Sequence, residues 1–168
     1  MKQKIIQLFV VLICLSLLCS CTGGYAVRID EGKMADDRIE QIVAALKEKN
    51  LESLKSLFSA KAISEAENFE NDFDRLFQFF QGTIETWERD SLAADRSIDY
   101  GKQSLMIRYG ILISTDIEDY SLFIIDYNID TINPDNEGIY MLEIWKQSYD
   151  GEWDSWQERM TPGISIIE

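Results

Sequence analysis

Histidine is missing from all 168 residues of the sequence. Its absence excludes serine and cysteine triads built on imidazole, and it removes the commonest general base and the commonest zinc ligand in proteins. Any catalysis would therefore depend on carboxylates, tyrosine, lysine or arginine. We recognise no catalytic motif, and the sequence predicts no cofactor and no metal site, so it favours a binding protein over an enzyme.

Cysteine is also rare, and its three copies, Cys14, Cys19 and Cys21, all lie near the start of the chain. The remaining residues cannot form disulfides, so a folded domain must depend on its hydrophobic core for stability. They also offer no thiol nucleophile if Cys21 is acylated.

Basic residues are few, because 16 lysines and arginines stand against 30 aspartates and glutamates, for a net charge of −14. Nucleic-acid binding requires a basic surface, so this charge argues against a nucleic-acid partner. It also argues against a domain that lies flat on an anionic membrane. The simplest interpretation is that the acidic surface keeps an exposed domain soluble.

The N-terminus has the pattern of a secretory signal. Lys2 and Lys4 precede the uncharged run from Ile5 to Leu18, which matches a basic region followed by an apolar region. The run is short for a transmembrane helix, which needs about 20 apolar residues. We therefore predict a signal peptide over residues 1–20.

The end of this segment, Leu18-Cys19-Ser20-Cys21, resembles a lipobox. The resemblance implies attachment of a diacylglycerol to Cys21 and cleavage before it, which would anchor the protein on the outer face of the cytoplasmic membrane. The alternatives are an ordinary signal peptide with incidental cysteines, or an uncleaved anchor helix.

The rest of the chain is consistent with one domain after a short linker. We expect residues 21–35 to form the lipidated N-terminus and a tether, and residues 36–168 to form the domain, with its first helix capped by Asp36 or Asp37. Apolar residues at helical spacing and then at alternating positions predict helices followed by strands. The expected helices are 36–50, 51–58 and 69–80, and the expected strands are 83–89, 98–100, 103–114, 120–132, 139–149, 152–158 and 164–167.

This order of elements predicts an α+β fold in which N-terminal helices pack on a curved antiparallel sheet. Gly101 and the pair Asp150-Gly151 are predicted to form hairpin turns. The segment 103–114 is apolar on both faces. The face away from the helices therefore needs a further layer, a curl of the sheet or a homodimer contact.

The same segments resemble a known fold and a known family. The helical stretch 36–50, the stretch from Asn50 to Ser59, the aromatic helix that closes in Phe80-Gln81-Gly82 and the long strands are similar to the nuclear-transport-factor-2-like (cystatin-like) cone. Four motifs resemble a family of uncharacterised Gram-positive lipoproteins across residues 34–149: Asp99–Lys102, Thr115-Asp116 before Tyr120, Phe123–Tyr127, and Asn133-Pro134 with Glu137-Gly138-Ile139. The resemblance implies a fold and a surface location, and it transfers no catalytic residue.

Acidic residues suggest two further hypotheses. The segment Asp126–Asp130 with Glu137 mimics part of an EF-hand calcium loop, but Thr131 stands where the loop requires glycine, so we reject this interpretation. A looser calcium site in the loop 133–137 competes with an ordinary solvated turn.

Asp126 and Glu143 lie among apolar neighbours on their strands. Inside a cone they could act as paired carboxylates of a dehydratase-like or isomerase-like enzyme, because burial raises a carboxyl pKa. The alternative is that both lie on a solvated face or at the rim.

Aromatic residues could line a ligand pocket or an interface, or they could be ordinary core and cross-strand neighbours. The prediction we favour is a lipid-anchored extracytoplasmic domain that binds a small ligand or a surface protein. The main aromatic candidates are Tyr109, Tyr127 and Trp145, and the further ones are Tyr140, Trp153 and Trp156.

Overall fold

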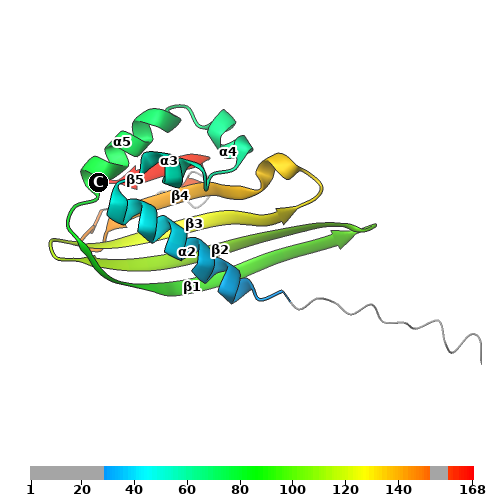
Figure 1. Cartoon of the computed structure of the whole chain (residues 1–168), viewed down its shortest axis with the longest axis horizontal. Helices are drawn as coiled ribbons and strands as arrows, with labels where there is room; N and C mark the ends of the chain where they lie inside the picture. The colour runs from blue at the N-terminus through cyan, green and yellow to red at the C-terminus, as the bar shows by residue number, and fades with distance from the viewer. Residues whose placement is uncertain (1–28, 152–158) are drawn as a thin grey trace, which may run out of the picture.

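The protein has a helical N-terminal half followed by a sheet, which confirms the predicted α+β class (Figure 1). The computed structural model describes residues 29–151 and 159–168. Its helices are α2 (Glu31–Glu48), α3 (Leu51–Lys55), α4 (Ala60–Glu65), α5 (Phe69–Phe79) and the 3-10 helix η1 (Pro134–Asn136). Its strands are β1 (Ile84–Asp99), β2 (Lys102–Thr115), β3 (Asp119–Asp130), β4 (Gly138–Lys146) and β5 (Gly163–Ile167).

Helix α2 begins earlier than the sequence predicts. Its N-cap is Asp30, whose side chain accepts a hydrogen bond of 3.0 Å from a backbone N–H of the first turn. The predicted N-cap at Asp36 or Asp37 is therefore wrong. Residues 31–35, expected in the tether, are helical because the buried apolar stripe extends back to Ala35.

The five strands form one open sheet in the order β1-β2-β3-β4-β5. Neighbours from β1 to β4 pair antiparallel, whereas β5 pairs parallel with β4. The predicted last strand at 164–167 corresponds to β5, which lies at one edge, and β1 lies at the other.

Strand β1 is continuous where the sequence predicts two separate strands. Residues 90–97 are exposed, and their sequence does not alternate between apolar and polar residues as that of a half-buried strand does. They nevertheless pair with β2, after a bulge between Arg89 and Ser91. Tyr100 and Gly101 adopt positive φ values of 47° and 81°, which suit a two-residue hairpin turn. The predicted turn at Gly101 is confirmed.

Helix α4 was not predicted, and the chain around it is fixed to β4. Between α3 and α4, Leu57 accepts a backbone hydrogen bond of 2.8 Å from Ile139, and Ser59 donates one of 3.0 Å to Ile139. Gly138 stands next to this contact with a φ of 119°. The close approach of two backbones requires a residue without a side chain.

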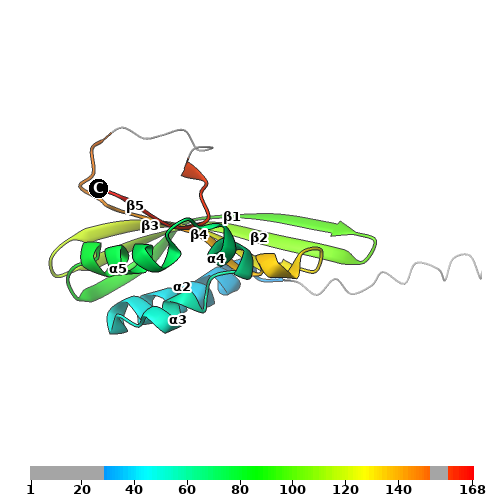
Figure 2. The same ribbon diagram turned by 90° about the horizontal axis from the view of Figure 1, so that it is seen from above.

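All the long helices lie on one face of the sheet, as Figure 2 shows. The main core is between these two layers, and the β2 side chains that share a predicted face contribute to it: Leu105, Ile107, Tyr109, Ile111 and Ile113. Helices α2 and α5 supply buried apolar residues from the other side.

The opposite face of the sheet also has buried residues. Ile125, Met141 and Glu143 are all buried but do not join the main cluster. Arg159 binds Glu143 on this face. On β2, for which the sequence predicts a further layer, a curl or a dimer contact, the far-face residues Met106 and Leu112 are only half-buried.

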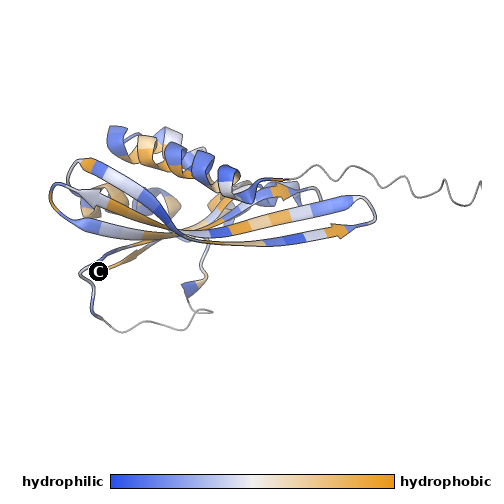
Figure 3. Cartoon of the chain, turned by 90° about the horizontal axis from the view of Figure 1, so that it is seen from below, coloured by the Kyte–Doolittle hydropathy of each residue, from blue (hydrophilic) through white to orange (hydrophobic). Residues whose placement is uncertain are grey.

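The sheet is longer than the helical layer. The β1–β2 hairpin projects beyond the start of α2, and the ends of α5 and β4 lie at the opposite end of the molecule (Figure 1). Figure 3 shows both hydrophilic and hydrophobic stretches along this hairpin. None of the helices in residues 29–151 and 159–168 is long and apolar enough to cross a membrane.

Candidate functional site

Asp126 lies on β3 with its side chain toward helix α2. It is completely buried, and its Oδ2 accepts a hydrogen bond of 2.8 Å from Nε of Arg38. Arg38 remains partly exposed at 21% of its side chain. The guanidinium therefore lies between the buried carboxylate and solvent.

The Tyr109 hydroxyl is a second polar group in this cluster. Burial, and then the neighbouring Asp126 carboxylate, raise the pKa of Tyr109 well above its ordinary value. Burial also raises the pKa of Asp126, although Arg38 opposes that shift. Neither the Tyr109 hydroxyl nor Asp126 Oδ1 has a hydrogen-bond partner of good geometry within the described residues.

A small hollow of about 200 Å³ lies beside this cluster, between α2 and β3. Arg38 and Asn128 line it, together with Met34, Asp37 and Gln41, whereas Asp126 and Tyr109 do not. The carboxylate and the phenol are therefore shielded from anything that enters the hollow. Chemistry at Asp126 would first require Arg38 to move.

Glu143 is also buried, but on the opposite face of the sheet. In the β3–β4 register Glu143 pairs with Phe123, whereas the core residue Leu142 pairs with Ile124. Arg159 binds both carboxylate oxygens, with Nε at 3.0 Å from Oε1 and Nη2 in contact with Oε2.

The two predicted carboxylates are therefore separated by the sheet. Ile124 and Asp126 face the helices, so Asp126 and Glu143 cannot act on one substrate as the cone hypothesis requires. The alternative of a solvated face or rim is also wrong, because both acids are buried. No sequence pattern pointed to the arginine partners, since Arg38 and Arg159 are 88 and 16 residues away from their acids.

The aromatic candidates do not gather at one place. Tyr109 belongs to the core under α2, whereas the Tyr127 ring contacts Tyr140 edge to face at 6.2 Å. Trp145 follows Glu143 by two residues on β4 and is half-buried. Trp153 and Trp156 lie outside the described residues.

The carboxylates near the loop 133–137 accept hydrogen bonds from backbone N–H groups. Asp130 accepts hydrogen bonds from the backbone N–H groups of Ile132 and Asn133 and from the Asn136 amide. Burial would raise the pKa of Asp130, but these hydrogen bonds outweigh burial and lower it. In the part of the chain that the structure describes, no group of three or more potential ligands among His, Cys, Asp and Glu is placed to hold a metal ion.

A larger pocket of about 570 Å³ lies at the end of α5, beside β4 and β5. No sequence pattern pointed to it, because its residues come from three distant segments. The residues that give it its character are two cations, two aromatic rings, one aliphatic side chain and one acid: Arg75, Lys146, Phe79, Tyr149, Ile167 and Glu168.

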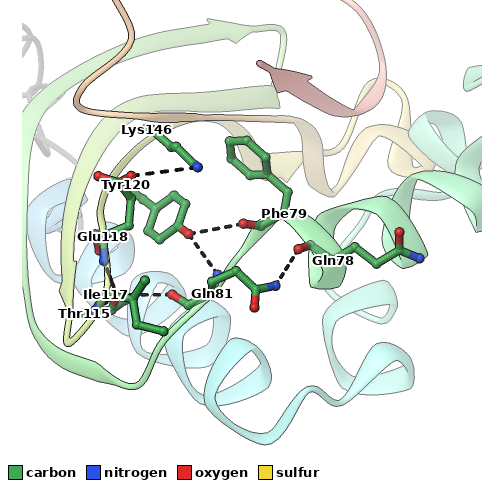
Figure 4. Close-up of polar contacts among 8 residues, drawn as sticks. All are labelled: Gln78, Phe79, Gln81, Thr115, Ile117, Glu118, Tyr120 and Lys146. Carbon is green, nitrogen blue, oxygen red and sulfur yellow. Dashed lines mark hydrogen bonds and ion pairs between the residues drawn. The ribbon is translucent and has the colours of Figure 1, made fainter.

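The buried Tyr120 fixes the wall of this pocket. Its hydroxyl donates a hydrogen bond of 3.1 Å to the Phe79 carbonyl and accepts one of 2.8 Å from the Gln81 backbone N–H (Figure 4). Thr115 Oγ1 donates to the Gln81 carbonyl, at 3.1 Å, or to the Glu118 carbonyl, at 2.7 Å. These contacts hold the end of α5 on the sheet, so the Phe79 ring has a defined position.

Lys146 completes this wall from β4. Its Nζ lies 5.8 Å from the centre of the Phe79 ring and 3.8 Å from a Glu118 carboxylate oxygen (Figure 4). The pocket thus places a cation directly beside an aromatic surface.

Residues 41–148 match a protein family described as a domain of unknown function, DUF5104. The chain belongs to this family. No curated protein matches the chain. The DUF5104 match agrees with the predicted uncharacterised family, and it brings no activity with it.

The DUF5104 region contains both buried acids and much of the larger pocket. Phe79, Lys146, Asp126 and Glu143 all lie within residues 41–148, whereas the arginines that bind the two acids lie outside it.

Proposed function

We propose that this DUF5104 protein is a lipid-anchored extracytoplasmic binding domain with a cystatin-like fold. The N-terminal signal pattern and the lipobox resemblance support an anchor at Cys21 on the outer face of the cytoplasmic membrane. The packing of helices on one face of a sheet supports the fold proposal, although the sheet is open.

The observation that carries this proposal is the pocket at the end of α5. Its volume of about 570 Å³ falls within the range of about 300–1,000 Å³ that is typical of small-molecule sites. It also combines an apolar wall with charged groups, which is how such sites bind and orient a ligand. We propose that a small ligand binds here.

A carboxylate-dependent enzyme receives less support from the geometry. Asp126 and Glu143 are on opposite faces, each is bound by an arginine, and neither lines this pocket. A surface protein as partner, by contrast, remains compatible with the open pocket.

Native mass spectrometry of the full chain, purified from membranes of its own host in a neutral detergent, tests the proposal. We expect a bound small molecule that is lost in a Phe79→Ala variant and retained in a Leu92→Ala variant. Leu92 is a suitable control because it is an exposed apolar residue on β1, away from the pocket. A protein without bound mass, or a ligand that Phe79→Ala leaves in place, would count against the pocket as a small-molecule site.

A further inference from the structure

We propose that the pocket at the end of α5 binds an amphipathic monocarboxylate, with its carboxylate between Arg75 and Lys146 and its apolar part over Phe79. This inference rests on the proposed function and specifies the ligand.

The first reason is the distance between each of the two cations and the acids nearest to it. Arg75 lies 3.6 Å from Asp72 and 3.7 Å from Glu168, and Lys146 lies 3.8 Å from Glu118. Charge-assisted hydrogen bonds are about 2.7–2.9 Å long. All three distances are longer than this, so none of these ion pairs is a charge-assisted hydrogen bond. Both cations can therefore form shorter hydrogen bonds with an incoming anion than with these acids.

The second reason is the Glu168 side chain, which lines the pocket beside Arg75. Its position demonstrates that a carboxylate fits next to the guanidinium. A ligand carboxylate that binds Arg75 more closely would compete with Glu168 for the same donors.

The balance of charge selects the class of anion. Two cations, Arg75 and Lys146, line the pocket, and three acids, Asp72, Glu168 and Glu118, lie within 4 Å of them. A ligand with a single negative charge is repelled less by these acids than a phosphate dianion or a dicarboxylate would be, in a chain that already carries −14. The acidic protein therefore favours a single carboxylate.

The third reason is the apolar surface next to the cations. Phe79, Tyr149 and Ile167 line the same pocket, and Lys146 Nζ is 5.8 Å from the centre of the Phe79 ring. A carboxylate held by Lys146 thus brings the rest of the ligand onto an aromatic ring whose backbone Tyr120 fixes. A purely polar anion would make no use of this apolar surface.

Isothermal titration calorimetry on the full chain in neutral detergent, with matched micelle blanks, tests the inference. The probes are 2-naphthoate, its neutral counterpart 2-naphthalenemethanol, and 2-naphthylmethylammonium. We expect 2-naphthoate to bind about tenfold or more tightly than the neutral alcohol, because it gains hydrogen bonds to charged donors. The ammonium probe should bind most weakly.

Variants of the pocket then separate charge from shape. Arg75→Gln and Lys146→Gln should each weaken 2-naphthoate about tenfold and leave the neutral alcohol unchanged, whereas Glu168→Gln should strengthen 2-naphthoate. Lys33→Gln is the control, because Lys33 is an exposed cation on α2 outside the pocket.

Equal binding of the three probes, or binding of 2-naphthoate that Arg75→Gln and Lys146→Gln do not weaken, would overturn the inference. Binding of none of the probes would overturn it as well. The proposed function would survive these results if native mass spectrometry found a neutral or cationic ligand that Phe79→Ala removes. The two proposals can therefore fail separately.

Discussion

Arg38 neutralises a carboxylate that water cannot reach. Its guanidinium binds the completely buried Asp126 while one edge stays in contact with solvent. Removing one partner of a buried ion pair is costly, because the other charge is left without compensation. The pair therefore affects the stability of the core more than an exposed ion pair would.

We predict that Arg38→Met lowers the free energy of unfolding by about 3 kcal/mol near neutral pH. Urea denaturation followed by circular dichroism measures this change. Lys33→Met is the matched control on the same helix, because Lys33 and Asp37 are more than half exposed and water screens such a pair, so its loss should change stability little. Similar losses in the two variants would contradict the prediction.

The raised pKa of Asp126 predicts a specific dependence of stability on pH. A carboxyl whose pKa is raised on folding binds its proton more tightly in the folded protein than in the unfolded chain. The stability of the wild type relative to Asp126→Asn should therefore increase as the pH falls through the raised pKa. The increase should stop below about 3.9, the ordinary pKa of aspartate.

Urea denaturation of both proteins between neutral and acidic pH measures this difference. The variant retains the other titrating groups, including Asp130, whose lowered pKa has the opposite effect. A difference that is constant with pH, or that shrinks as the pH falls, would argue against a raised pKa at Asp126.

The Tyr120 hydroxyl predicts a further effect at the level of one atom. Tyr120→Phe removes the acceptor of the Gln81 N–H and the donor to the Phe79 carbonyl, so it should cost about 1–3 kcal/mol. Thermal denaturation measures the loss. Tyr100→Phe should have no effect, since Tyr100 is fully exposed, and an equal loss in both would refute the role of the hydroxyl.

At the scale of the elements, β4 and the chain before α4 approach each other closely at Gly138. A Cβ atom on Gly138 would come within 2.8 Å of the Ser59 nitrogen and 2.9 Å of the Leu57 oxygen. Both atoms belong to backbone that is hydrogen-bonded to Ile139, so they cannot easily move away.

Gly138→Val should therefore destabilise the protein by more than about 2 kcal/mol, through backbone strain and steric overlap together. Gly101→Val is the matched control, because Gly101 also has a positive φ but a Cβ there would meet nothing within 4 Å. Urea denaturation compares the two. If Gly101→Val costs as much as Gly138→Val, strain alone explains the result.

The sequence predicts the helices and strands better than it predicts which of them contact each other. Buried residues at helical spacing, such as Ile39, Ile42 and Leu46, correctly predict that α2 exists but not where it begins, because helical periodicity is a local property. The exposed middle of β1 and the six-residue α4 leave little apolar pattern, so both were missed in part or completely. The middle of β1 is a strand because it pairs with β2, and local periodicity cannot predict that pairing.

The surroundings of the candidate site residues are even harder to predict from local sequence patterns. The apolar neighbours of Asp126 and Glu143 left open whether these acids are buried or lie on a solvated face, and the face that each one takes depends on the register between β3 and β4. That register includes a bulge after Ile125 that no sequence pattern announces. The pocket at the end of α5 depends on tertiary packing and was not predictable at all.

The exposed edge of the sheet is protected by charge. Seven of the 16 residues of β1 are charged, and charged residues on an edge strand discourage pairing with another sheet. We therefore expect a homodimer, if one forms, to use a surface other than this edge.

For the whole molecule, the decisive prediction concerns the anchor. Cys21→Ser should move the protein from the membrane fraction to the soluble fraction, or leave the signal peptide uncleaved, because the lipid attachment residue is lost. Cell fractionation with metabolic fatty-acid labelling measures both outcomes. Cys19→Ser is the control, and continued labelling of the Cys21→Ser protein would refute the lipobox assignment.

If this anchor exists, the two ends of the molecule lie at different distances from the membrane. Helix α2 starts at the end from which the β1–β2 hairpin projects, whereas the pocket is at the end where α5 and β4 finish (Figure 1). A tether that joins the chain just before α2 leaves the hairpin end nearer to the bilayer and turns the pocket outward. A ligand of the proposed pocket would then come from the surroundings of the cell, and the pocket would be poorly placed to extract lipids from the membrane that holds the anchor.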